Sequence, residues 1–114
     1  MIKQNELRVG NWILSVSGEP FRVNAYDLVD IERFPHNPIV LTPEMLERCS
    51  FENVKGLWYE HTEFSIFLTE CGGVYFGEVL NVDSPIIARI KYLHQLQNLF
   101  FALFQKELEV KEIA

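Results

Sequence analysis

The sequence predicts an α+β fold in which an antiparallel sheet, or a small open β-barrel, carries a long C-terminal helix packed on it. In residues 64–79, apolar and other side chains alternate on either side of a glycine turn, which predicts a β-hairpin. Residues 92–105 instead repeat their apolar positions at helical spacing. Because short turns rather than helices join the expected strands, neighbouring strands should run antiparallel. Two small sheets separated by a short helix are the alternative.

The first part of the chain is expected to form strands joined by turns. Residues 7–16 and 21–26 are rich in β-forming side chains, and the Ser-Gly-Glu-Pro sequence between them predicts a hairpin. Gly10 marks a bend or bulge within the first strand. A further strand is expected over residues 28–33. Two prolines and an asparagine in residues 34–38 should then interrupt the sheet.

A short helix is predicted to begin at Pro43 and to end near Cys49. Thr42 is a suitable N-cap, proline suits the first helical position, and Glu44 favours the positive end of the helix dipole. Farther along, Trp58 and Tyr59 are expected to join or cover the edge of the sheet.

The C-terminal part of the chain is predicted to hold one more strand and the long helix. Residues 86–90 should form the strand, and residues 107–110 a last edge strand. In the long helix, Leu96 lies at the centre of the apolar arc and Gln97 lies on the opposite, polar side.

Length and composition predict a single domain over residues 1–114. The chain is 48% hydrophobic, which is enough to fill one core. No apolar run approaches the roughly 20 residues of a membrane span, and the first residues lack the apolar stretch of a signal peptide. We therefore expect a cytoplasmic protein that does not enter a membrane, with Cys49 and Cys71 as free thiols.

The net charge of −6 disfavours nucleic acid as a partner. Residues 56–88 contain no Lys or Arg but hold five acidic residues, namely Glu60, Glu63, Glu70, Glu78 and Asp83. Such a stretch keeps an exposed sheet face soluble, or it imitates a phosphate surface for a basic partner. The sequence is compatible with both interpretations.

The chain offers no recognisable catalytic, cofactor-binding or metal-binding motif. Its histidines, His36, His61 and His94, and its two cysteines are scattered singly rather than at the spacings of zinc ligands. The Gly-Gly pair at residues 72–73 lacks the lysine and the helix start of a phosphate loop. The sequence therefore favours a non-enzymatic protein without metal or cofactor.

The polar side of the long helix contains a candidate interaction strip, formed by His94, Gln97, Asn98 and Phe101. These residues follow one another at helical spacing and so lie along one line of the helix. Uncharged hydrogen-bonding groups beside an exposed aromatic ring are typical of a protein interface. Alternatively, a second layer of the same chain covers the strip, or the strip is ordinary surface.

Three sequence blocks resemble a small protein family encoded by phages, prophages and mobile elements of gut bacteria. The blocks are LRVGNWI at residues 7–13, LTPEMLERC at 41–49 and YLHQLQNLFFAL at 92–103. The third is the most specific of them, and residues 58–83 contribute nothing to the resemblance. The resemblance implies a small accessory protein; it implies no activity, cofactor or catalytic residue.

From these observations we expect a non-enzymatic accessory protein that acts as a protein-interaction module. Its partner would be another protein or, in a homodimer, a second copy of the chain. One alternative is a small enzyme or ligand-binding protein, with a pocket between sheet and helix that uses His61, Cys71 or His94. Another is a nucleic-acid-binding module that uses the basic and aromatic residues of the first hairpin, Arg8, Trp12 and Arg22.

Overall fold

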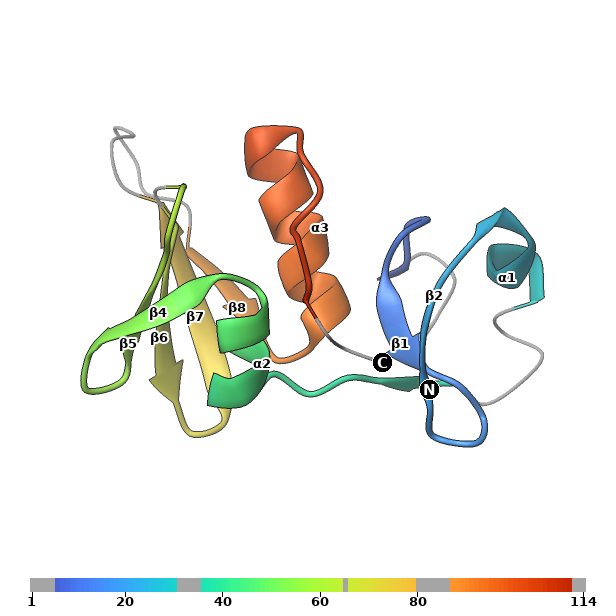
Figure 1. Ribbon diagram of the computed structural model, residues 1–114, viewed down its shortest axis with the longest axis horizontal. Helices are drawn as coiled ribbons and strands as arrows, with labels where there is room; N and C mark the ends of the chain where they lie inside the picture. The colour runs from blue at the N-terminus through green and yellow to red at the C-terminus, as the bar shows by residue number, and fades with distance from the viewer. Residues whose placement is uncertain (1–5, 31–35, 65, 80–86, 112–114) are drawn as a thin grey trace. The chain divides into compact units, whose positions relative to one another are not determined.

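The computed structural model describes residues 6–30, 36–64, 66–79 and 87–111, and its fold is α+β as the sequence predicts (Figure 1). These residues form three helices and eight strands, arranged in two antiparallel sheets that do not close into a barrel. The alternative with two small sheets therefore describes the molecule better than a single sheet. None of the helices in these ranges is long and apolar enough to cross a membrane.

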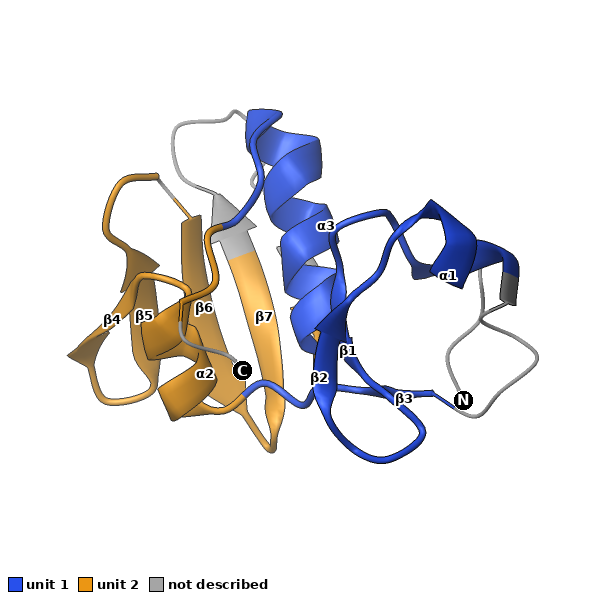
Figure 2. Cartoon of the chain, turned by 45° about the vertical axis from the view of Figure 1, so that its right-hand side comes forward, with its two compact units in different colours: residues 1–41, 92–108, 112–114 blue, residues 42–91, 109–111 orange. Residues whose placement is uncertain are grey.

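The chain forms two compact units, which Figure 2 shows in different colours. The first unit contains residues 1–41, 92–108 and 112–114, and the second contains residues 42–91 and 109–111. The first unit is thus assembled from both ends of the chain. Whether the two units unfold together as the predicted single domain stays a prediction.

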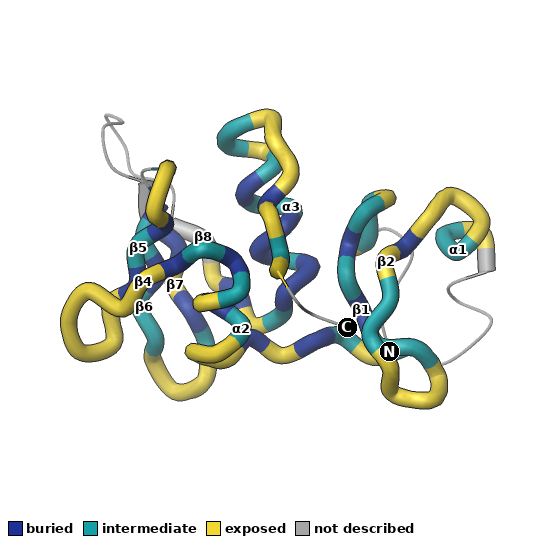
Figure 3. Tube along the Cα trace, viewed as in Figure 1, coloured by how far each residue is buried: buried dark blue, intermediate teal, exposed yellow. Residues whose placement is uncertain are grey.

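The first unit contains a three-stranded sheet with the order β2-β1-β3. The predicted hairpin is present, because β1 (Trp12–Leu14) pairs antiparallel with β2 (Pro20–Arg22). Gly10 precedes β1 with a φ of 97°, a left-handed conformation that suits the expected bend. Ile13 and Val23 are buried and form the core of this hairpin. Figure 3 shows where buried and exposed stretches lie along the chain.

Residues 25–30 form helix α1 (Ala25–Asp30), not the strands expected over 21–26 and 28–33. Two reciprocal hydrogen bonds explain the difference. The backbone N–H of Asp27 donates to Asn24 Oδ1 and that of Asn24 donates to Asp27 Oδ2, both at 2.9 Å. This pair of side chains caps the helix start in the manner of a capping box. Residues 31–33 of the expected strand lie outside the described residues.

Strand β3 (Asn37–Pro38) lies where the sequence predicted an interruption of the sheet. It pairs antiparallel with β1, with Ile13 opposite Pro38. The prediction was wrong because β3 is an edge strand of its sheet. A proline there removes no hydrogen bond that the sheet needs.

Helix α2 (Pro43–Arg48) in the second unit begins as the sequence predicts. The hydroxyl oxygen of Thr42 accepts a hydrogen bond from the backbone N–H of Met45 at 3.1 Å, and Pro43 occupies the first turn. Leu46 and Cys49 are fully buried. The apolar side of this short helix therefore packs into the protein, and that packing stabilises it.

A five-stranded antiparallel meander follows α2, with the strands in chain order. Its strands are β4 (Phe51–Lys55), β5 (Trp58–His61), β6 (Ile66–Cys71), β7 (Val74–Val79) and β8 (Ile87–Ile90). The predicted hairpin is the β6–β7 pair. Its turn glycines, Gly72 and Gly73, both have positive φ. Ile66 and Leu68 are fully buried, which confirms the predicted alternation.

At the edges of this part of the chain, the sequence analysis missed one strand and predicted another that is absent. Strand β4 was not expected, because four of its five residues are exposed and no alternating apolar pattern is visible. Residues 107–110 were expected to form a strand, but they have no regular secondary structure. Leu108 is nevertheless buried, so the apolar residue at this position packs into the protein without belonging to a strand.

Helix α3 (Leu93–Phe104) confirms the predicted long amphipathic helix, and in the first unit it packs against β1. Gln95 Oε1 accepts a hydrogen bond from the backbone N–H of Tyr92 at 3.1 Å, which caps the helix start. Leu93, Leu96 and Phe100 are buried, as their place on the apolar arc predicts.

Candidate functional site

The structure places the predicted interaction strip of α3 against the N-terminal part of the same unit. His94 and Gln97 are only 1% exposed, and Asn98 and Phe101 are half-buried. Gln97 Oε1 accepts a hydrogen bond from the backbone N–H of Trp12 at 2.8 Å, and Gln97 Nε2 donates to the backbone carbonyl of Gly10 at 3.1 Å. For His94 and Gln97, the alternative in which a second layer of the same chain covers the strip is therefore correct. A role for the strip in binding a partner stays a prediction.

Asn98 and Phe101 also contact residues that are distant in the sequence. The Asn98 amide accepts a hydrogen bond from Asn11 Nδ2 at 2.9 Å and donates one to the Glu6 carbonyl at 3.0 Å. The guanidinium of Arg8 lies 4.4 Å from the centre of the Phe101 ring, within cation–π range. The same guanidinium forms an ion pair with Glu107. The neutral groups of the strip thus hold the N-terminal segment on α3.

His94 has an unusual environment for a histidine. Its ring stacks on Tyr92 with 5.9 Å between the centroids, and its Nε2 atom lies 3.7 Å from a carboxylate oxygen of Glu6. Neither ring nitrogen has a hydrogen-bond partner among the described residues. Burial lowers the pKa of His94, and the Glu6 carboxylate opposes this shift. The neutral imidazole is the form that folding favours.

Within the second unit, His61 and Cys71 of the enzyme alternative do not form a catalytic pair. Nδ1 of His61 accepts two backbone N–H bonds, from Glu63 at 3.1 Å and from Phe64 at 3.2 Å. Because Trp58 pairs with Thr69, His61 and Cys71 lie at opposite ends of the β5–β6 ladder, about 16 Å apart at about 3.3 Å per residue. His61 therefore stabilises a turn, and nothing aligns it with the thiol.

The cysteines and acidic side chains form no visible metal centre in the described ranges, where no group of three or more His, Cys, Asp or Glu residues could hold an ion. Cys49 and Cys71 are free thiols, as expected. Burial raises the pKa of Cys49 to about 12, so this thiol is protonated and unreactive near neutral pH.

The residues of the nucleic-acid alternative are partly engaged within the chain. Arg8 is held by Glu107 and by the Phe101 ring, as described above. The guanidinium of Arg22 lies 5.9 Å from the centre of the Trp12 ring. An ion-paired arginine adds little net positive charge for a phosphate contact. The hairpin therefore offers a weaker basic surface than its sequence suggests.

The five-stranded sheet carries a feature that the sequence analysis missed, which we name the aromatic row. Directly opposed residues of an antiparallel sheet point to the same face, and the register aligns one residue from each strand: Lys55, Trp58, Thr69, Phe76 and Arg89. Trp58 is 47% exposed and Phe76 is 38% exposed. Two aromatic side chains thus lie uncovered between two basic ones.

A hollow of about 350 Å³ lies at the Lys55 end of the aromatic row. Lys55, Leu57, Trp58 and Thr69 line it, and the ring of Phe67 lies 6.1 Å from that of Trp58. Leu57 is itself 56% exposed. The hollow is therefore bordered by apolar side chains and by one amino group. Phe67 and Phe76 each stand between buried neighbours, but this local alternation does not show that Trp58 and Phe76 lie in one row, which depends on the strand register.

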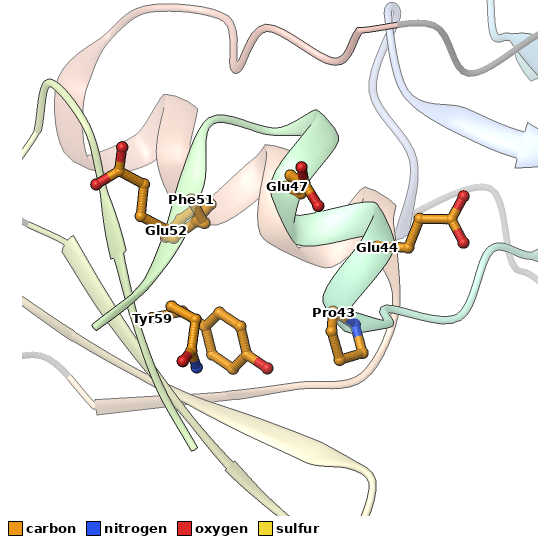
Figure 4. A pocket seen from close by; sticks show the side chains of 7 residues that line it. Pro43, Glu44, Glu47, Phe51, Glu52 and Tyr59 are labelled. Carbon is orange, nitrogen blue, oxygen red and sulfur yellow. The ribbon is translucent and has the colours of Figure 1, made fainter. Parts of the chain in front are cut away.

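A second hollow of about 480 Å³ lies between α2 and strands β4 and β5, all in the second unit. Seven residues line it: Pro43, Glu44, Glu47, Phe51, Glu52, Asn53 and Tyr59. Three are glutamates and none is basic. Figure 4 shows the Tyr59 ring lying across this space. We name it the glutamate pocket.

Comparisons of the chain with protein-family models, with curated proteins and with solved structures found no match.

Proposed function

We propose that this protein is a non-enzymatic protein-interaction module that binds its partner through the aromatic row. The observation that carries the proposal is the exposure of Trp58 and Phe76 in one row of the sheet. Covering such rings with a partner removes apolar surface from water, which is favourable. Aromatic and arginine side chains are also those enriched at protein interfaces, and Arg89 ends the row.

The hollow beside Trp58 supports the same proposal. Interfaces draw most of their binding energy from a few large side chains seated in pockets. A volume of about 350 Å³ between Leu57, Trp58 and Thr69 accommodates one such apolar anchor. Lys55 and Arg89 stand at the two ends of the row, so the partner segment should have an apolar centre and acidic ends.

The genetic context suggested by the three sequence blocks completes the proposal. It makes the protein a cytoplasmic accessory protein of a phage, prophage or mobile element, and the partner another protein of the host or of the element. A second copy of the chain is the other occupant, and the experiment below distinguishes the two.

The proposal is tested by removing one ring at a time from the aromatic row. We expect Trp58→Ser and Phe76→Ser each to abolish capture of a partner from host lysate, while the exposed control Glu19→Gln keeps it. Circular dichroism checks that each variant is folded. A partner retained by both serine variants but lost with Phe101→Ser would contradict the proposal and return the interface to the strip on α3. Sedimentation across a concentration series shows whether the captured species is a second copy.

Single-stranded nucleic acid is a second candidate, favoured by the same row. Bases stack on aromatic side chains of exposed sheets, and flanking basic groups contact the phosphates. Glu52 and Glu60, paired on neighbouring strands, place negative charge beside the row and disfavour this candidate. Anisotropy of a labelled oligonucleotide at low salt decides: binding that weakens with added salt and is lost in Trp58→Ser would favour nucleic acid over protein.

A further inference from the structure

The sheet face that carries the aromatic row has a second row of side chains beside it. The register pairs Glu52 with Glu60 and Glu60 with Phe67, and we name these three residues the acidic row. Glu60 follows Trp58 by two residues on β5, so both rows lie on one face, about 7 Å apart at about 3.4 Å per residue. Figure 4 shows the Glu52 carboxylate turned away from Tyr59, which is buried on the other face.

The charged groups of the two rows are not neutralised within the described part of the chain. Four of them form no ion pair with any described residue: Lys55, Arg89, Glu52 and Glu60. Glu52 and Glu60 are also directly opposed on neighbouring strands, and like charges in that position destabilise a sheet. A basic group brought against this pair would relieve the repulsion. The same face holds such groups at the two ends of the aromatic row.

The two rows also complement each other in shape. In the aromatic row, Thr69 stands between Trp58 and Phe76, and a threonine side chain is shorter than the rings on either side of it. Thr69 also lines the hollow of about 350 Å³. A ring from a second face therefore fits over Thr69. Phe67 of the acidic row is such a ring, and it lies on the same strand as Thr69.

Two copies of this face can stack about a two-fold axis that runs either along the strands or across them. An axis along the strands lays each row over its own reverse, so Lys55 meets Arg89 of the second copy and the two repel. An axis across the strands exchanges the rows. Lys55 then faces Glu52 of the second copy, and Thr69 faces Phe67 of the second copy. Only this arrangement joins opposite charges and places a ring over the short side chain.

We propose that a second copy of the chain covers this face in the free protein, about a two-fold axis that runs across the strands. Each Lys55 lies against the Glu52–Glu60 pair of the other copy, and each Phe67 ring lies over Thr69 of the other copy. Complementary charges around an apolar centre fix the register of such an interface. The inference rests on the proposed function, because both use the aromatic row; a partner protein then binds the row by displacing the second copy.

The test is sedimentation of the full chain across a concentration series up to about 1 mM. Salt at about 0.15 M limits the repulsion between two copies of net charge −6. We expect a reversible monomer–dimer equilibrium. Lys55→Glu and Glu52→Lys each bring like charges together twice, so each alone should raise the dimer Kd at least about tenfold. Glu19→Lys, which changes the charge as much as Glu52→Lys but lies in the first unit, should leave the Kd unchanged.

An equimolar mixture of Lys55→Glu and Glu52→Lys tests which residues meet. In a mixed dimer the introduced glutamate faces the introduced lysine, and the native Lys55 faces the native Glu52. The mixture should therefore recover a dimer about as tight as that of the wild type, although each variant alone does not. Both residues are exposed on β4, so neither substitution disturbs the core, and circular dichroism checks that both variants are folded.

Three results would overturn the inference: a wild-type chain that stays monomeric, a dimer that neither charge variant weakens, or a mixture that does not recover the dimer. A monomer that captures a partner through Trp58 would overturn it while leaving the proposed function intact. A dimer recovered by mixing, together with a partner that is lost only in Phe101→Ser, would instead support the inference and contradict the proposed function.

Discussion

Gln97 shows that a residue on the polar side of a helix can be buried, although helical periodicity predicts that it is exposed. Its position on the polar arc of α3 predicts exposure, yet its amide is buried and bonded to the Trp12 N–H and the Gly10 carbonyl. A glutamine amide satisfies one donor and one acceptor at once. It can therefore pair with an irregular backbone segment such as the bend at Gly10. Sequence periodicity shows where a polar residue lies on a helix, but not whether the chain returns to cover it.

Gln97→Ala should lower the free energy of unfolding by about 2–4 kcal/mol. The substitution leaves the part-buried backbone N–H of Trp12 and the carbonyl of Gly10 without these partners, and each such loss costs about 1–3 kcal/mol. Urea denaturation measures the change, with the exposed Glu109→Ala as a control that should shift stability by no more than about 0.5 kcal/mol. A Gln97→Ala change as small as the control would mean that the N-terminal segment does not pack on α3.

Leu96→Ala should cost about 2–5 kcal/mol, as truncation of a fully buried leucine does. The same denaturation experiment measures it, and Leu96→Met, which nearly conserves volume, should cost less than about 1.5 kcal/mol. An unchanged midpoint for Leu96→Ala would place the wrong face of α3 in the core.

The free energy of unfolding should fall as the pH is lowered from 6.5 to 5.5, partly because of His94. Burial lowers the pKa of His94 below its ordinary value of 6.5, and that of His61 as well. The unfolded chain therefore binds more protons than the folded chain in this pH window, which favours unfolding. The contribution of these histidines to stability is fully present above pH 6.5 and declines below it. The nearby carboxylate of Glu6 reduces the effect on His94.

His94→Gln should flatten this pH dependence, and the double variant with His61→Gln should flatten it further. Denaturant titrations at pH 7.5, 6.5 and 5.5 provide the measurement. A slope that His94→Gln leaves intact would show that His94 keeps its ordinary pKa in the folded protein.

At the scale of elements, the sequence predicted those that carry local signals and missed those fixed by tertiary pairing. The N-cap at Thr42 and the glycine turn of the β6–β7 hairpin both depend on neighbouring residues, and both are present. Strand β4 has no such signal, because its pairing with β5 leaves most of its side chains exposed. Helix α1 was missed because the β-forming side chains around it predicted a strand, although Asn24 and Asp27 are spaced as a helix-capping pair. The aromatic row needs the register of all five strands, which no local pattern supplies.

Thr42→Ala should destabilise the protein by about 1 kcal/mol, the usual cost of losing an N-cap hydrogen bond. Thr42→Ser keeps the hydroxyl that accepts from the Met45 N–H, so it should retain most of the stability. Thermal or urea denaturation of the pair provides the measurement. If serine and alanine were equally destabilising, the methyl group rather than the cap would be the stabilising part of Thr42.

At the scale of the whole molecule, the chain enters the second unit from the first and then returns to the first, so the two units are connected twice. Residues 42–91, most of the second unit, are inserted between the two segments that form the first. Within the first unit these segments meet where the Leu93 N–H donates to the Ile39 carbonyl at 2.8 Å and Val40 pairs with Tyr92. If the insertion unfolded alone, the first unit would have to close a flexible loop of that length. Closure of a loop costs conformational entropy that increases with its length.

We therefore expect the two units to unfold in one cooperative transition, as a single domain would. The chain contains two tryptophans, Trp12 in the first unit and Trp58 in the second. Trp58→Phe leaves a fluorescence probe in the first unit alone, and Trp12→Phe leaves one in the second. In urea, each variant's fluorescence midpoint should coincide with its own midpoint by far-ultraviolet circular dichroism, since coincident transitions are the test of two-state unfolding. A fluorescence midpoint that departs from the dichroism midpoint in either variant would show that the units are separate domains, because one of them would then unfold while the other kept its structure.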